Sequence, residues 1–168
     1  MVQPSDVVQP SDVVMPSGEA LLQEERRVRR QGSGLDATAL VGCWQLDLVW
    51  PKGSGRPAQF SGQILRWLGA QLEISQAGEQ LRLRNAVSLG PIELRFEGPG
   101  VLEGRRPLLW FHFEQLQIWV AGRCWFSRSL PAPAAQKRPF FALIQRDPSG
   151  WLAARGRGGG LACWRLRL

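Results

Sequence analysis

The feature that most constrains this fold is a change in hydrophobic period near residue 40. From there on, apolar and polar residues alternate in short segments, as in strands that bury one face. Trp44, Leu46 and Leu48 fall on one side of the first segment, with Gln45 and Asp47 on the other. The alternation predicts an all-β domain.

The segments are short and repeat along the rest of the chain. About nine or ten strands are expected, with turn signals roughly every eight to twelve residues. Pro51–Gly55, Ala77–Glu79 and Gly98–Gly100 are predicted turns, and Gln63–Leu68 is a predicted strand. This pattern is typical of an antiparallel barrel or sandwich, and closure into a barrel would remove exposed edges.

The chain before residue 40 has a different character. The six-residue segment Val2–Val7 is repeated as Val8–Val13, and Val14–Glu19 is a third, altered copy. Proline therefore recurs every six residues, which disfavours both a helix and a strand ladder. We predict a disordered repeat tail over residues 1–17 and one barrel domain over residues 18–168. Within that domain, Ser17 is expected to cap a short N-terminal helix over Gly18–Arg30.

Charge is unevenly distributed along the sequence. The net charge is +7, and residues 121–168 hold nine basic residues against Asp147 alone, a net of +8. Such a region indicates an anionic partner, such as a membrane surface, an acidic protein or nucleic acid, or else a solvated face in an Arg-rich protein. One glycine-arginine motif between two strands is weak evidence for RNA binding, and we expect no nucleic-acid partner.

Catalytic chemistry is sparse in this sequence. His112 is the single histidine, and no G-x-S-x-G motif accompanies it. Glu93 and Glu97 share a strand face with Arg95, which indicates a solvated outer face rather than an acid–base pair. The three cysteines, listed last, are far apart and predict buried apolar residues rather than a zinc site or disulfides: Cys43, Cys124 and Cys163. We expect no enzyme activity, no metal and no cofactor.

Several apolar residues are candidates for lining a cavity inside the barrel. Trp44, Leu46, Phe111 and Phe113 fall on the rows expected to face inward. His112 is either a strand residue satisfied by a neighbour or a polar group placed in that cavity.

The glycine-rich segment Arg155–Gly160 has two interpretations. It is either a hairpin whose glycines allow positive φ, or a place where Arg155 and Arg157 hold an anionic head group.

The sequence contains eight tryptophans, more than one small core accommodates. Trp110 and Trp119 fall on the faces opposite Phe111 and Ile118. They indicate either ordinary core and rim packing or surface anchors for a partner. A structural or assembly module that binds another protein through exposed tryptophan and the basic C-terminal surface is therefore an alternative function.

Two segments resemble the plastid lipid-associated proteins, the fibrillins of plastids and cyanobacteria. Leu40–Leu46 resembles the Leu-x-Gly-x-Trp-x-Leu opening of that family, whose G-x-W element is also lipocalin-like. Arg138–Ile144 and Trp151–Leu161 resemble its glycine-rich closing hairpin, although the usual acidic residue before the arginine is missing. The resemblance covers about residues 20–168.

The resemblance implies a lipocalin-like, calycin-type barrel that binds a hydrophobic small molecule or lipid, such as an isoprenoid, quinone or carotenoid-like compound. It implies a setting at or near photosynthetic membranes and no catalytic residues. The sequence start has neither a basic segment nor an apolar stretch, so we expect a cytoplasmic protein, peripheral to the thylakoid membrane. A third interpretation is a bilin-attachment enzyme of the calycin kind, which would use Glu114 or His112.

Overall fold

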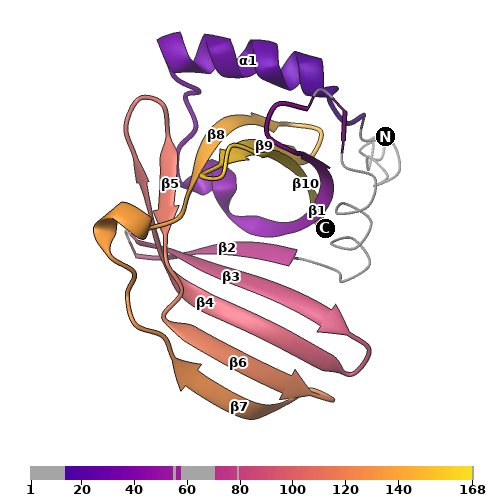
Figure 1. The fold of residues 1–168 in the computed structure, drawn as a ribbon, viewed down its shortest axis with the longest axis vertical. Coiled ribbons are helices and arrows are strands. Elements are labelled where there is room, and N and C mark those ends of the chain that lie inside the picture. The colour runs from indigo at the N-terminus through magenta and orange to yellow at the C-terminus, as the bar shows by residue number, and fades with distance from the viewer. Residues whose placement is uncertain (1–13, 55, 58–70, 79, 168) are drawn as a thin grey trace, which may run out of the picture.

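The computed structural model describes residues 14–54, 56–57, 71–78 and 80–167. One α-helix precedes a long series of strands, with short 3-10 helices at Thr38–Leu40 and Ala135–Lys137 (Figure 1). In chain order the elements are α1 (Gly18–Gln31), β1 (Gly42–Trp50), β2 (Gln71–Ala77), β3 (Gln80–Leu89), β4 (Ile92–Glu103), β5 (Leu108–Phe111), β6 (Gln115–Val120), β7 (Arg123–Ser129), β8 (Phe140–Asp147), β9 (Trp151–Gly156) and β10 (Leu161–Arg167).

Eight of these strands close into a barrel. Their order is β3-β2-β1-β10-β9-β8-β5-β4, and the antiparallel pairing of β3 with β4 completes the circle. The all-β antiparallel barrel with a short N-terminal helix is therefore confirmed. The predicted strand Gln63–Leu68 and most of the predicted repeat tail lie outside the described residues.

Alternation within the strands explains what the barrel contains. Trp44 on β1, Leu83 on β3 and Leu143 on β8 point inward and are at most 1% exposed. Because neighbouring side chains on a strand point to opposite faces, every second residue joins this core. The inner cluster comprises Leu40, Trp44, Leu46, Leu72, Ile74, Leu81, Leu83, Leu109, Phe111, Leu143, Leu152, Ala154 and Trp164.

Helix α1 covers the outside of the barrel. Ser17 caps it as predicted, because its hydroxyl accepts a hydrogen bond from the Ala20 amide at 3.1 Å. Leu21 packs into a second cluster, together with side chains from the outer faces of β8, β9 and β10. These three strands are therefore buried on both faces, and β9 is buried along Trp151–Ala154. Composition favours this helix, and its packing against the barrel stabilises it.

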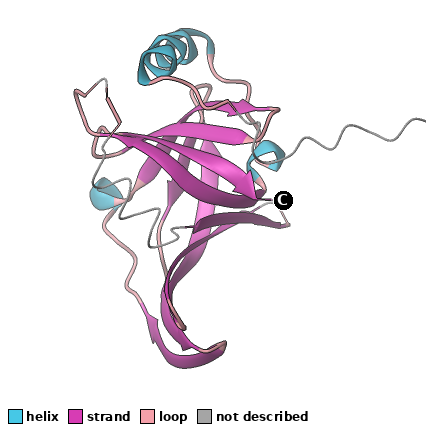
Figure 2. Cartoon of the chain, turned by 90° about the vertical axis from the view of Figure 1, so that its right-hand side faces the viewer, coloured by secondary structure: helices cyan, strands magenta, loops and turns pink. Residues whose placement is uncertain are grey.

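Strands β6 and β7 do not belong to the barrel. They extend the sheet from the first half of β4, where Ile92–Glu97 pairs with Val120–Gln115 of β6. Residues 87–97 of β3 and β4, together with β6 and β7, form a projection that we call the arm (Figures 1 and 2). All six residues of β6 are half-buried, and all seven residues of β7 are exposed.

The predicted turn at Gly98–Gly100 is wrong, because these residues lie inside β4. They mark the point where β4 leaves its partner β6 and begins to pair with β5 at Gly100. A Cβ on Gly98 would overlap the backbone carbonyl oxygen of His112. The glycine is therefore needed for close backbone approach within a strand, a role that composition does not distinguish from a turn.

Candidate ligand-binding pocket

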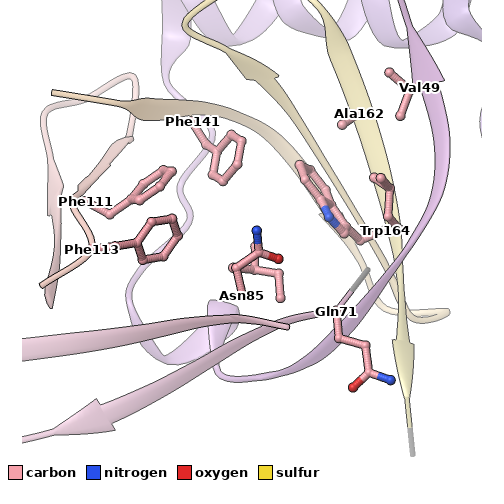
Figure 3. A pocket seen from close by; sticks show the side chains of 10 residues that line it. Val49, Gln71, Asn85, Phe111, Phe113, Phe141, Ala162 and Trp164 are labelled. Carbon is pink, nitrogen blue, oxygen red and sulfur yellow. The ribbon is translucent and has the colours of Figure 1, made fainter. Parts of the chain in front are cut away.

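A pocket of about 340 Å³ lies inside the barrel. Its walls come from β1, β2, β3, β8 and β10, and from β5 with the segment that follows it (Figure 3). Most of the walls are apolar side chains. The lining residues are Leu46, Val49, Gln71, Leu72, Asn85, Phe111, Phe113, Phe141, Ala162 and Trp164.

Aromatic rings form a continuous wall along the pocket. The ring of Phe141 lies edge-on to Trp164, with centroids 5.3 Å apart, and stacks on Phe111 at 5.0 Å. Phe111 lies 5.6 Å from Phe113, which in turn lies 5.5 Å from Phe96 on the arm. These separations are those of favourable aromatic pairs. The row of five rings therefore runs from the pocket to the beginning of the arm.

One amide side chain enters this apolar space. Asn85 lies on β3 in the inward row that contains Leu81 and Leu83, and its amide points into the pocket between Phe113 and Trp164 (Figure 3). The backbone of Asn85 pairs with β2 and β4, but its side-chain amide makes no hydrogen bond to another described residue. The second lining amide, Gln71, points away from the pocket and accepts a contact from the Cys43 thiol at 3.8 Å. Among the described lining residues, Asn85 is therefore the polar group available to a ligand.

Sequence reasoning missed Asn85, although a signal was present. Leu81, Leu83, Asn85, Val87 and Leu89 occupy alternate positions of one strand, and Asn85 is the polar interruption. A polar residue in an inward row either finds a partner or faces a cavity, since burying an unpaired amide costs free energy. The interruption itself indicated a site.

Three predicted cavity residues meet at the pocket, namely Leu46, Phe111 and Phe113. Trp44, the fourth, is fully buried in the adjoining core and does not line the pocket. Its indole Nε1 donates a hydrogen bond to the carbonyl oxygen of Leu40 at 2.8 Å. Trp44 thus supports the barrel wall behind the pocket.

His112 lies between the two pocket phenylalanines in sequence but outside the pocket. Its Nε2 is 3.5 Å from the Glu114 carboxylate, a contact with the next polar residue on the same side of the chain. This contact matches the interpretation of His112 as a strand residue whose polar group is satisfied by a neighbour.

The arginines of the closing hairpin also lie away from the pocket. Arg155 forms two hydrogen bonds to the Glu25 carboxylate of α1, at 2.7 and 2.6 Å. Arg157 donates to the backbone carbonyl oxygens of Gln136 and Arg138. Neither side chain shares a site with the aromatic wall, so the head-group role that we predicted for them stays a prediction.

Glu25 organises the end of the barrel beneath α1. It is 3% exposed and also accepts hydrogen bonds from Arg106 at 3.0 Å and Arg29 at 3.1 Å. Burial alone would raise the pKa of Glu25, but hydrogen bonds from Arg155 and Arg29 outweigh burial and hold its pKa below the ordinary value. The carboxylate therefore stays charged and holds the helix to the barrel.

Among the described residues, no group of three or more His, Cys, Asp or Glu side chains is placed to hold a metal ion. The three cysteines are all free, and the prediction that they are buried matches Cys163 alone. It is wrong for Cys124, because β7 is the outermost strand and nothing described covers it, and Cys43 is only half-buried. Within the same part of the chain, none of the helices has the length and apolar character to span a bilayer.

The fold and the pocket define a class, an antiparallel β-barrel protein with an apolar internal pocket. Searches of known protein families and of curated proteins find no match to this sequence. The resemblance to fibrillins stays a prediction that rests on the residues quoted for it.

Proposed function

We propose that this protein binds an apolar small molecule, or the apolar part of a lipid, in the barrel pocket without catalysing a reaction. The observation that carries the proposal is the aromatic wall of Phe111, Phe141 and Trp164 facing the inward amide of Asn85. Ligand pockets commonly combine apolar walls with a few placed polar groups. Here the walls supply burial and the amide supplies orientation.

The size of the pocket limits the ligand. A volume of about 340 Å³ lies near the lower end of the range typical of small-molecule sites. It suits one ring system or a single isoprenoid segment better than a whole two-chain lipid. The resemblance to fibrillins adds the expected class, an isoprenoid, quinone or carotenoid-like compound, and a setting near photosynthetic membranes.

Titration with retinol tests this proposal, because retinol is a fluorescent isoprenoid with one hydroxyl group. We expect saturable binding with one site per chain, accompanied by quenching of Trp164, which lines the pocket. Ala162→Trp should fill the pocket and abolish saturable binding. Val101→Trp is the matched control, since Val101 is 40% exposed and outside the pocket lining, and it should bind like the native protein.

The role of Asn85 has its own measurement. Asn85→Leu should weaken retinol binding by about 3- to 10-fold, the loss expected for one neutral hydrogen bond. Binding of anhydroretinol, a hydrocarbon analogue that lacks the hydroxyl group, should not weaken. Absence of saturable binding by both compounds, or equal binding by the Ala162→Trp variant, would count against an internal site.

A further inference from the structure

The tip of the arm gathers more than half of the exposed large apolar side chains of the described residues. Among the described residues, seven large apolar side chains are exposed, and four of the seven lie at this tip. Trp125 is 77% exposed, Leu89 51%, and Ile92 and Phe126 each 46%. Scattered exposed apolar residues need no explanation, but a cluster marks a contact surface.

Two turns hold this tip together. The β3–β4 turn and the β6–β7 turn meet where the Ala121 amide donates a hydrogen bond to the Pro91 carbonyl oxygen at 2.8 Å. Strand pairing then aligns apolar side chains across the sheet, because residues paired across antiparallel strands share one face. The row across the four strands is Val87, Leu94, Ile118 and Phe126.

Trp125 owes its exposure to an irregularity in β7. Ile118 pairs with Phe126, but the next residue, Trp119, pairs with Cys124. The register shift leaves Trp125 with no residue opposite it on β6. Such bulges direct a side chain away from the regular ladder. The most exposed tryptophan of the described chain therefore projects from the outermost strand.

The charges around these apolar side chains are of one sign. Strands β6 and β7 contain Arg123 and Arg128 and no Asp or Glu. In register, Arg123 lies opposite Val120 and Arg128 opposite Leu116, so both belong to the apolar face.

The acidic residues of the arm lie on its other face and are paired there. Glu97 accepts a hydrogen bond from Arg84 at 2.8 Å, and Glu93 pairs with Arg95. The guanidinium of Arg95 also stacks on Trp119 at 4.0 Å, which places that tryptophan on the polar face. The face that carries Phe126 thus presents apolar side chains with arginine as its only charge.

We propose that the arm tip docks onto an anionic lipid bilayer. Trp125 and Phe126 would enter the interface between head groups and acyl chains, where large aromatic side chains are favoured. Arg123 and Arg128 would meet anionic head groups, whose negative surface potential attracts basic residues near the membrane. This inference goes beyond the proposed ligand site and does not depend on an occupied pocket.

A second copy of the chain fits this surface less well. Stable protein interfaces use roughly 20–30 residues from each partner, and the tip offers a much smaller apolar set. Two copies joined there would also bring four arginines of like charge together. A bilayer imposes neither restriction, because a small apolar tip can insert while arginines remain among anionic head groups.

Vesicle flotation tests the proposal with the full chain. One set of vesicles contains phosphatidylcholine alone, and the other an equal mixture of phosphatidylcholine and phosphatidylglycerol. We expect at least about tenfold stronger binding to the anionic vesicles at low salt, with the difference reduced at high salt.

The double variant Trp125→Ser/Phe126→Ser should lose binding by about tenfold or more, and so should Arg123→Gln/Arg128→Gln. Matched controls remove exposed residues elsewhere: Val101→Ser for an apolar side chain and Arg105→Gln for a charge. Both controls should bind like the native chain. Because all the changed residues are exposed, circular dichroism should show the native fold throughout.

Three results would overturn the proposal. These are equal binding to the two vesicle types, native binding by both arm variants, and an oligomer in ultracentrifugation that the Trp125→Ser/Phe126→Ser change dissociates. Retinol binding measured without vesicles separates the test of membrane docking from the test of the barrel pocket. Arm variants should retain it, and a protein unable to bind retinol would still report on vesicle docking.

Discussion

The barrel and the arm use the same alternation of residues but differ in what covers them. Strands β8, β9 and β10 have the core on one side and α1 on the other, so Leu143 and Ala153 are both buried. Strand β6 has an equally apolar row, yet none of its residues is buried. Alternation therefore tells which residues share a face, while topology decides whether that face is covered.

Thiol labelling should show the largest difference between the two regions. Burial raises the pKa of Cys163 in the barrel to about 12. At neutral pH that leaves roughly three-thousandfold less reactive thiolate than an ordinary thiol with a pKa near 8.5 has. A maleimide should label exposed Cys124 of β7 rapidly and Cys163 only after unfolding, as peptide mass spectrometry would show. Rapid native labelling of Cys163 would contradict the barrel.

The second largest difference is expected between matched leucine truncations, in the free energy of unfolding that each removes. Leu143→Ala removes a side chain that is 1% exposed and should lower the free energy of unfolding by about 3 kcal/mol. Leu94→Ala removes a half-buried side chain of the arm and should cost about 1 kcal/mol or less. Urea denaturation measures both changes. Equal costs would mean that the arm face is covered.

Removal of the Glu25 carboxylate should loosen the contact between α1 and the barrel, so that the outer face of the barrel becomes less well covered, as the arm is. Glu25→Gln leaves Arg155 and Arg106 without their acceptor charge and should destabilise the protein by about 2 kcal/mol. Glu24→Gln is the control, because its pair with Arg27 is on the surface, and it should cost about 0.5 kcal/mol or less. Hydrogen exchange should accelerate in α1 and along β9, but not in the arm.

The stability that Glu25 and its arginine partners contribute should depend on pH in one direction. The folded-state pKa of Glu25 is lowered, so the unfolded chain takes up its proton first as the solution becomes acidic. The stabilisation is complete above the ordinary pKa of about 4.3 and is lost as pH falls through the lower folded-state value. Native protein should therefore lose more stability than Glu25→Gln between neutral and strongly acidic pH. Parallel losses would argue against the pair.

The smallest effect is expected at the β6–β7 turn. Ala121 has φ 48° and Gly122 has φ 78°, the positive values of a two-residue hairpin turn in which asparagine is preferred at the first position. Ala121→Asn should stabilise the protein by about 0.5 kcal/mol and slow hydrogen exchange in the arm alone. Ala121→Val should have the opposite effect, and stabilisation by valine would rule out this turn.

Local chemistry made much of the fold predictable. The Ser17 cap, the helix that follows it and the inward rows that contain Leu46, Phe111 and Phe113 all follow from residue type and spacing. Each depends on neighbours within a few positions. The shared polar face of Glu93 and Arg95 follows in the same way, although both side chains are half-buried and paired with each other.

What escaped prediction depends on contacts between distant parts of the chain. Glu25 and Arg155 are 130 residues apart, so spacing alone gave no reason to pair them. Gly98 is a strand residue because the backbone at His112 approaches it, whereas the local sequence resembles a turn. Asn85 became a candidate only when barrel closure placed it opposite Phe113.

The bulge in β7 gives the molecule a built-in optical probe. Trp44, Trp50, Trp151 and Trp164 are buried, Trp110 and Trp119 are half-buried, and Trp125 alone is exposed among the described tryptophans. Water around an exposed indole shifts its emission to longer wavelength, so the red side of the tryptophan emission should be weighted toward Trp125 among the described tryptophans. Acrylamide should quench that emission strongly in solution and weakly once the arm enters lipid, so docking can be followed without any added dye.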